Sequence, residues 1–354
     1  MTKTLIKGNE ALAMAAIRGG CTHFFGYPIT PQNEIPEFLA RELPQAGGVF
    51  LQAESELAAI NMVYGAAAAG GRPMTSSSSP GIALMQETIS ILSAAQLGCV
   101  IVNVQRGGPG IGSIQPSQSD YYQMTRGGGN GDYRIIALAP ASAQEGAEMM
   151  VKGFELAERY RTPVFIVSDG MLGQMMEPVD FTGINPNGKT RSKGTVTGHG
   201  GIRPPITIKT LSLDPEKLER INDQLQEKFS RIAATEKRYE AYRTKDAEII
   251  FCAYGSASRI AMNGVDILRG KNIAAGLVRV QTLWPFPDQP LKNLPPTCKQ
   301  ILCVEMSCGQ MIDDVRLAVG ERFPVAHYGR SGGVIPAPEE LVREAERLLG
   351  RKKR

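Results

Sequence analysis

The chain has 354 residues, of which 42% are hydrophobic, and its formal net charge is +4. This length favours about two domains, and so small a net charge, with four basic residues in the terminal Arg-Lys-Lys-Arg, excludes the strongly basic surface of a typical nucleic-acid-binding protein. Neither a long apolar run nor the apolar centre of a signal peptide occurs, so the sequence predicts a cytoplasmic protein without a membrane span.

Short apolar runs separated by glycines fill residues 1–180. They are rich in Val, Ile and Phe, which is typical of strands buried on both faces: THFFGY, GVFLQ, CVIVNVQ, RIIALAP and PVFIVSD. Helical patterns lie between them, notably at 56–69, 82–96 and 143–159. This alternation predicts a parallel α/β sheet over residues 1–180.

The composition changes in residues 181–244. The segment up to about Pro215 has few apolar residues and many Gly, Pro, Thr and Lys, so it predicts a linker or an excursion over a partner's surface. Asp214 and Pro215 then begin a predicted connector helix that runs to Arg243. Its apolar side chains recur every three or four residues, at Leu218, Ile221, Leu225, Phe229 and Ile232.

Alternation of strands and helices resumes in residues 245–350. The pattern is EIIFCAYG, a helix from Ser256, IAAGLVRV, QILCVEM, a helix from Met311, and a loop with a closing helix in SGGVIPAPEELVREAERLL. These residues predict a second, smaller α/β domain.

Six cysteines are spread over the chain, which is typical of a reducing compartment. Cys298, Cys303 and Cys308 form C-x4-C-x4-C, but an iron–sulfur cluster usually needs four thiolates at closer spacing. Cys303 also lies within a predicted buried strand. Any electron-transfer centre is therefore expected on another chain.

The segment Tyr27-Pro28-Ile29-Thr30-Pro31 ends the first of the predicted buried strands. Each proline removes a backbone donor and favours an extended residue before it. Thr30 is expected as a helix N-cap with Pro31 at the first helical position. The turn would lie at the carboxyl end of a parallel strand, where open α/β sheets bind ligands, and capping by Thr30 is compatible with substrate contact.

Polar side chains also follow other predicted strands. Glu54 and Glu56 stand at the start of an alanine-rich helix, where a carboxylate favours the helix dipole, and at most one of the two faces a given site. The hydroxyls of TSSSSPG, residues 75–81, either hold a polar ligand or cap the next helix. Arg106 precedes a glycine-rich loop, and its charge either suits an anionic substrate or is merely solvated.

Taken in order, these segments resemble the alpha chain of the 2-oxoacid:ferredoxin oxidoreductases. The resemblance covers nearly the whole chain and rests on YPITP, AESE, TSSSSPG, QRGGPG with QPSQSD, a distal SDG, VEMSCGQM and GRSGGVIPAPEE. YPITPQNEIPE and QAESELAAINMVYGAA are most similar to the branched-chain, 2-oxoisovalerate type. The implied fold is a pyrimidine-type thiamine diphosphate-binding domain at 1–180, followed by a transketolase C-terminal-like α/β domain.

The resemblance implies that thiamine diphosphate binds between two chains, with its pyrimidine ring against this one. The implied cofactor contacts are Tyr27, Pro28, Ile29 and Glu56. The diphosphate and Mg²⁺ are implied on a beta subunit. In this chain the nearest imitation of the metal motif is Ser168-Asp169-Gly170, which lacks the family's first glycine and a suitably spaced asparagine, so no metal ligand is expected here.

The resemblance also implies residue roles. A carboxylate against N1′ of the pyrimidine favours the imino tautomer that takes the proton from thiazolium C2. Glu56 matches this residue through its spacing of nine residues to Gly65, and Glu54 is its competitor. Thr30 and Arg106 match residues near the 2-oxoacid carboxylate, which an arginine holds in two parallel hydrogen bonds. The family's VEMN is VEMS here, at residues 304–307, which leaves a ligand role for that loop open.

The implied reaction is the oxidative decarboxylation of a 2-oxoacid with coenzyme A to acyl-CoA and CO₂. Electrons pass singly to iron–sulfur clusters on other chains and then to ferredoxin. The implied partners are a beta subunit, a gamma subunit and a ferredoxin-like delta subunit, without nucleic acid or membrane. The alternatives are a 2-oxoglutarate-specific enzyme of the same family, a non-oxidative thiamine-dependent decarboxylase or transketolase-like half, and a structural or regulatory paralogue.

Overall fold

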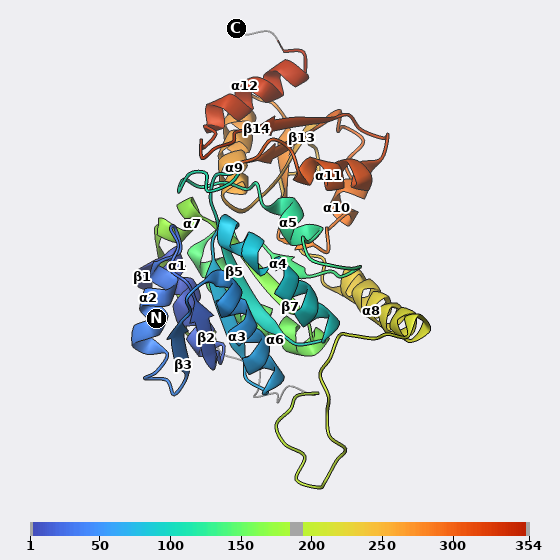
Figure 1. Cartoon of the computed structure of the whole chain (residues 1–354). Helices are drawn as coiled ribbons and strands as arrows, with labels where there is room; N and C mark the ends of the chain where they lie inside the picture. Colours follow the sequence, from blue (N-terminus) through green and yellow to red (C-terminus); the bar gives the residue numbers. More distant parts are fainter. Residues whose placement is uncertain (1–2, 185–193, 352–354) are drawn as a thin grey trace.

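A seven-stranded sheet forms the centre of the first half of the chain (Figure 1). The computed structural model describes residues 3–184 and 194–351. The strand order is β12-β6-β7-β5-β4-β2-β3, and all neighbours are parallel except β12 and β6. The strands are β2 (His23–Gly26), β3 (Val49–Gln52), β4 (Pro73–Ser77), β5 (Cys99–Gln105), β6 (Ile136–Leu138), β7 (Pro163–Asp169) and β12 (Thr282–Trp284). The predicted parallel α/β sheet is therefore confirmed.

The burial of the strands follows their place in the sheet. Every residue of β5 and β7, in the middle, is buried. By contrast β3 is an edge strand, and its Val49 and Leu51 are exposed. The prediction that the run GVFLQ is buried on both faces is wrong, because at the edge of the sheet other elements cover the faces of β3 only in part.

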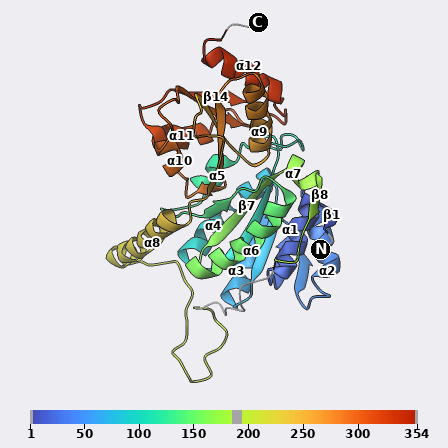
Figure 2. The same cartoon turned by 180° about the vertical axis from the view of Figure 1, so that it is seen from behind.

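Helices cover both faces of this sheet (Figures 1 and 2). The first half contains α1 (Gly8–Arg18), α2 (Glu34–Glu42), α3 (Glu56–Ala68), α4 (Ser79–Ala94), α5 (Tyr121–Thr125), α6 (Ala143–Tyr160) and α7 (Gly170–Gln174). α1 packs against α6 on one face, and α3 packs against α4 on the other. A separate antiparallel ribbon pairs β1 (Thr4–Lys7) with β8 (Met176–Val179).

A five-stranded sheet forms the centre of the second half, in the order β14-β13-β10-β11-β9. Its strands are β9 (Tyr239–Tyr242), β10 (Ile249–Tyr254), β11 (Ala275–Val280), β13 (Gln300–Glu305) and β14 (Val325–Gly329). Its helices are α9 (Gly255–Gly270), α10 (Gln289–Lys292), α11 (Met311–Val319) and α12 (Pro338–Leu348). All neighbouring strands are parallel except β9 and β11.

The connector helix is shorter than the sequence predicts. α8 (Pro215–Thr235) begins as expected, since the Asp214 side chain accepts a hydrogen bond of 3.1 Å from Lys217 N. It ends at Thr235 rather than at Arg243, because the apolar spacing stops at Ile232 and residues 239–242 pair with β11.

Two short strands cross the predicted domain boundaries. β9 lies within the predicted connector but extends the second sheet. β12 lies within the predicted second domain but pairs with β6 of the first sheet, and its Trp284 ring meets Phe229 of α8 edge-on. The two halves therefore share strands as well as a surface.

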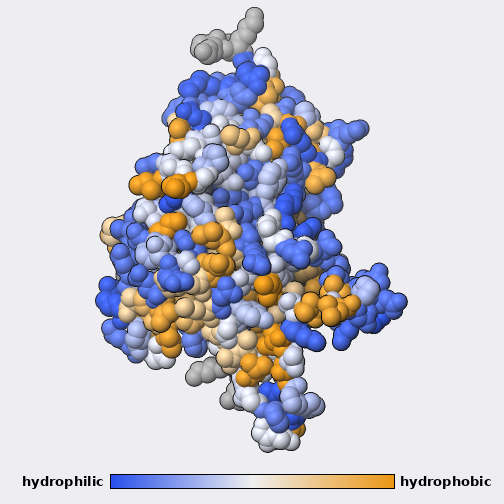
Figure 3. All heavy atoms as spheres, viewed as in Figure 1, coloured by the Kyte–Doolittle hydropathy of each residue, from blue (hydrophilic) through white to orange (hydrophobic). Residues whose placement is uncertain are grey.

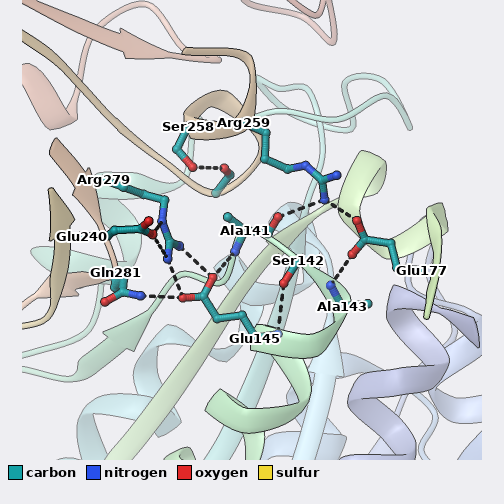
Figure 4. Close-up of polar contacts among 11 residues, drawn as sticks. Ala141, Ser142, Ala143, Glu145, Glu177, Glu240, Ser258, Arg259, Arg279 and Gln281 are labelled. Carbon is teal, nitrogen blue, oxygen red and sulfur yellow. Dashed lines mark hydrogen bonds and ion pairs between the residues drawn. The ribbon is translucent and has the colours of Figure 1, made fainter. Parts of the chain in front are cut away.

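A polar network joins the two halves where α6 begins (Figure 4). Arg279 of β11 donates two hydrogen bonds to Glu145 of α6, at 2.7 and 2.9 Å, and a third of 2.9 Å to Glu240. Glu145 also accepts from Ala141 N, while Ser142 accepts from Glu145 N, so the same carboxylate completes the N-terminus of the helix. Burial lowers the pKa of Arg279, but the hydrogen bonds and charges of Glu145 and Glu240 together outweigh it, so the pKa is raised.

A second ion pair extends this network. Arg259 of α9 donates to Glu177 of β8 and to Ala141 O, and Glu177 in turn accepts from Ala143 N at 2.7 Å. The backbone ahead of α6 is therefore held by charged groups from both halves. Among the helices that the structure describes, none is long and apolar enough to cross a membrane.

Removal of the Glu145 charge should weaken the contact between the two halves of the chain and lower the stability of the fold. Arg279 is 7% exposed, and Glu145→Gln would keep one acceptor for its guanidinium but leave the charge paired with Glu240 only among the contacts described. We expect a loss of about 2 kcal/mol in the free energy of unfolding, measured by urea denaturation. Glu344→Gln, which breaks the more exposed pair with Arg347, is the matched control and should cost less than about 1 kcal/mol. Equal losses in both variants would contradict the special role of Glu145.

Candidate active site

Polar residues from four neighbouring strands meet at one edge of the first sheet. Strands β3, β2, β4 and β5 lie side by side and run parallel, so their carboxyl ends share this edge. Ser77 ends β4 and Arg106 directly follows β5, while Thr30 and Glu56 each come four residues after the ends of β2 and β3. The fold thus brings together the three predicted site residues Thr30, Glu56 and Arg106, in the place that an open α/β sheet uses for ligands.

Glu56 is the first residue of α3, and its side chain is 6% exposed. The helix is capped by Ser55, whose side chain accepts from Ala58 N at 3.2 Å. In the described part of the chain, no hydrogen bond or ion pair reaches the Glu56 carboxylate. Its competitor Glu54 is exposed. A buried carboxylate is costly without a partner, so Glu56 is a candidate for contact with a hydrogen-bond donor from outside the chain.

The serine turn after β4 forms the wall next to Glu56. A Cβ added at Gly81 would lie 2.6 Å from Glu56 Oε1 and 2.1 Å from Ser77 Oγ, so only glycine fits there. The hydroxyls of Thr75, Ser77 and Ser78 are buried without a partner in the described residues. Ser78 is the N-cap of α4 but makes no side-chain cap bond, so the capping interpretation of this turn is wrong for its side chain.

The turn after β2 differs from the prediction. α2 begins at Glu34 after Asn33, and not at Pro31 after Thr30. Residues 29–32 instead form a tight turn, in which the Thr30–Pro31 peptide is cis and Gln32 N donates to Ile29 O. The prediction that Thr30 is an N-cap is therefore wrong.

The other predicted cofactor contacts, Tyr27, Pro28 and Ile29, lie in or next to this turn. Tyr27 and Pro28 are exposed, Ile29 is half-buried, and Gln32 donates to Tyr27 O at 3.2 Å. The Gln32 side chain also accepts from Ser76 Oγ, which ties the turn to β4. Thr30 itself is exposed at the carboxyl edge of the sheet.

Arg106 is 8% exposed, so the interpretation as a merely solvated strand end is wrong. Its guanidinium donates to Thr30 O and to Ile111 O, both at 2.9 Å, and its buried Nε has no partner in the described residues. The chain after it folds back, since Gly112 has φ +60° and a Cβ there would lie 1.8 Å from Gly107 O. The glycines thus place a loop tip over the arginine.

A buried carboxylate beneath this loop was not singled out from the sequence. Asp120 Oδ2 accepts from Ser79 Oγ and from Asn103 Nδ2, and Ser79 also accepts from Arg106 N. Burial raises the pKa of Asp120 above its ordinary 3.8, against the hydrogen bonds from Ser79 and Asn103, which lower it. Asp120 belongs to QPSQSD, but nothing in that segment shows that its carboxylate will be buried.

The carboxylates of two further acidic residues, Asp169 and Glu305, accept hydrogen bonds from the backbone at the start of a helix. Asp169 accepts from Met171 N and Leu172 N at 2.9 and 3.1 Å and so caps α7. Glu305, in the VEMS segment, is fully buried and accepts from the backbone N of Gln310, Met311 and Ile312 at 3.0 to 3.2 Å. Its carboxylate therefore caps α11.

Two family descriptions match the sequence in series. Residues 14–243 match the thiamine diphosphate-binding region of pyruvate flavodoxin/ferredoxin oxidoreductases. The chain belongs to the thiamine-dependent 2-oxoacid:ferredoxin oxidoreductase family. Residues 247–341 match core domain II of pyruvate:ferredoxin oxidoreductase. The resemblance read from the motifs is therefore confirmed, with the binding region on the sheet that carries the candidate site.

Relatives of this oxidoreductase subunit cover its whole length. It is 44% identical to the ketoisovalerate oxidoreductase subunit VorB of Methanothermobacter thermautotrophicus, over 99% of both chains. It is 36% identical to the 2-oxoglutarate synthase subunit KorA of Methanocaldococcus jannaschii, over 97% of this chain and 99% of that one. Both relatives are named as subunits of oxidoreductases or synthases.

Solved structures confirm the predicted fold class. The 2-oxoglutarate:ferredoxin oxidoreductase of Magnetococcus marinus, solved with 2-oxoglutarate, coenzyme A and succinyl-CoA, matches with a TM-score of 0.86 and 27% identity. The match covers 98% of this chain and 65% of that one. A split-gene transketolase in an inactive tetramer matches with a TM-score of 0.57 and 15% identity over 96% of this chain and 93% of that one, and so shares the fold.

The buried Asp120 predicts a pH dependence. Its pKa is higher in the folded than in the unfolded chain, so the folded chain binds more protons and loses stability as the pH rises above 3.8. Asp120→Asn keeps an acceptor for Ser79 and Asn103 but removes the charge. We expect the stability of the variant relative to wild type to increase between pH 4 and about pH 7, measured by urea unfolding. Parallel pH profiles would contradict this assignment.

Proposed function

We propose that this chain is the alpha subunit of a 2-oxoacid:ferredoxin oxidoreductase that acts on 2-oxoisovalerate. The reaction is oxidative decarboxylation with coenzyme A, which yields the acyl-CoA, CO₂ and reduced ferredoxin. The single observation that carries the proposal is the buried Glu56 carboxylate, which lies at a ligand-binding sheet edge with no partner in the described residues. The 44% identity to ketoisovalerate oxidoreductase subunits supports the substrate.

The residues around Glu56 fit the aminopyrimidine of thiamine diphosphate. Gly81 brings the backbone of α4 close against Glu56 and Ser77, and the Ser77 hydroxyl is buried without a partner in the described residues, so both side chains can bind polar atoms of the ring. Glu56 would hold a proton at a ring nitrogen, and Tyr27, Pro28 and Ile29 would contact the ring from the turn after β2. When bound, the cofactor supplies the electron sink for decarboxylation.

Arg106 and Thr30 would hold the 2-oxoacid. A guanidinium binds a carboxylate through two parallel hydrogen bonds, and Arg106 has a buried Nε without a partner in the described residues. The exposed Thr30 lies beside it, since Thr30 O accepts from Arg106. Ile111, whose carbonyl also accepts from Arg106, is 82% exposed, and Ile114 is 56% exposed. An apolar loop tip supports a branched-chain oxoacid, because 2-oxoglutarate needs a second cation for its distal carboxylate.

An apolar surface beside the site supports a partner subunit. Val49 and Leu51 of β3, Leu57 and Met62 of α3, and Tyr27 are all exposed. Figure 3 shows hydrophobic residues gathered over α3 and β3. Exposed apolar residues that gather on one face mark an interaction site, and we assign this one to the beta subunit, which would carry the diphosphate and Mg²⁺.

The remaining components of the proposed complex lie on other chains. These are the iron–sulfur clusters, a gamma subunit and a ferredoxin-like delta subunit, with ferredoxin as the acceptor. We also propose residues 1–180 as the pyrimidine-binding domain, 181–244 as the connector and 245–350 as the transketolase C-terminal-like domain. All six cysteines are free thiols, which supports a cytoplasmic compartment.

Glu56→Gln tests the catalytic assignment. The variant keeps the size of the side chain but loses the charge that holds the ring proton, so turnover of the assembled complex should fall about 100-fold or more. Glu54→Gln removes an exposed carboxylate two residues away and is the matched control, expected to keep wild-type turnover. Unchanged turnover in Glu56→Gln would refute the assignment.

A substrate panel tests the activity. The co-purified complex is assayed for viologen reduction with several 2-oxoacids, with and without coenzyme A. We expect kcat/KM for 2-oxoisovalerate to exceed that for 2-oxoglutarate by about tenfold or more, because one apolar group is worth this much in a fitting pocket. Reduction by 2-oxoglutarate alone would refute the branched-chain preference. Release of CO₂ without dye reduction would favour the non-oxidative alternative.

A further inference from the structure

The second sheet has a ligand crevice that is already filled. In its order β14-β13-β10-β11-β9, the parallel strands run outward from β10 in both directions, so the topological switch point lies between β10 and β13. Open α/β sheets bind ligands in the crevice at the carboxyl ends of such strands. Here those ends are Tyr254 and the Glu305–Met306 segment.

Gln118 of the first domain occupies this crevice. Its side-chain Nε2 donates to Tyr254 O at 2.9 Å, and its Oε1 accepts from Met306 N at 3.0 Å. Its backbone N donates to Met306 O at 2.9 Å, and its backbone O accepts from the Tyr254 hydroxyl at 3.1 Å. Gln118 is fully buried, and all four of its polar groups bind the second domain, as a ligand would.

The crevice is shaped for this side chain. Gly255 has φ +52° at the end of β10, and a Cβ there would lie 3.1 Å from Gln118 Nε2. The glycine therefore allows both the turn into α9 and the close approach of the amide. Asp169 of β7 also comes to this point, since its Oδ2 would lie 3.9 Å from the same Cβ. Two side chains of the first domain thus fill the crevice of the second.

The segment around Gln118 is tied directly to Arg106. Arg106 pairs with Pro116 as a β-bridge, and Gly107 N donates to Gln115 O at 2.9 Å. The second domain also presses on this loop, because a Cβ at Gly107 would lie 2.9 Å from the backbone carbon of Gly332. The loop that covers Arg106 is therefore anchored at its far end by the Gln118 crevice.

We propose that Gln118 is a positioning residue for the oxoacid site, and that the second domain uses its ligand crevice to fix the Arg106 loop. This inference rests on the proposed role of Arg106 in binding the oxoacid carboxylate. Gln118 touches neither substrate nor cofactor. It acts by keeping residues 107–116, and with them the Arg106 guanidinium, in one geometry.

Gln118→Ala in the assembled complex tests this by steady-state kinetics. We expect KM for the 2-oxoacid to rise about tenfold or more, since misplacing a binding group costs this much, with kcat and KM for coenzyme A near wild type. Gln118→Met has a side chain of similar size and keeps the backbone hydrogen bonds to Met306 O and the Tyr254 hydroxyl, so a rise in this variant too would show that the side-chain hydrogen bonds, and not a cavity, are responsible. The control is Gln300→Ala, which loses two bonds of another buried glutamine, at the amino end of β13.

Hydrogen exchange of the full chain supplies a readout that does not need activity. Amides of residues 107–116 should exchange about tenfold faster in Gln118→Ala than in wild type. In Gln300→Ala their exchange rates should equal those of wild type. If wild type itself lacks oxoacid turnover, the proposed function fails while the exchange test still stands. Equal exchange in both variants, or a general loss of kcat instead of a KM change, would overturn the positioning role. If Gln118→Ala does not fold, the same outcomes apply to Gln118→Met.

Discussion

The ion pair between Arg279 and Glu145 is the joint on which the arrangement of the molecule depends. It is bidentate and nearly buried, and its carboxylate also completes the N-terminus of α6. A buried pair of this kind fixes an orientation well, because removal of either partner leaves a nearly buried charge with fewer hydrogen bonds. The candidate site needs that orientation, since the second half of the chain reaches across to the loop over Arg106.

The parallel sheet explains why site residues far apart in the sequence meet. Each of β2 to β5 delivers its next residue to the same edge, and the helix that follows returns the chain to the start of the next strand. The edge is rich in polar groups that the protein leaves without partners, above all the Glu56 carboxylate and the Ser77 hydroxyl. Such groups destabilise the folded chain, so they indicate a place where binding of another molecule completes the structure.

Much of this arrangement follows from the sequence, and the exceptions have physical causes. Buried strands such as β5 and β7 are continuous apolar runs, so their pattern identifies them. β3 has a similar composition but lies at an edge, which no local pattern records. The local sequence around Thr30 is that of an N-cap, yet residues 29–32 form a turn and the helix begins only at Glu34. Arg106 was recognised as a candidate, but its burial depends on the Ile111 carbonyl, which the glycines bring back over it.

Tertiary pairings were beyond reach of the sequence altogether. Nothing in QPSQSD distinguishes Gln118 from a solvated glutamine, because its partners Tyr254 and Met306 are more than a hundred residues away. The pairing of β12 could not be predicted either, because an edge strand of the first sheet is made by residues 282–284, beyond the start of the second domain. The two domains are therefore not interchangeable modules. A fragment cut at the sequence boundary would expose β6 as an open edge prone to aggregation, and a recombinant that swapped the second domain between relatives would have to bring a matching strand with it.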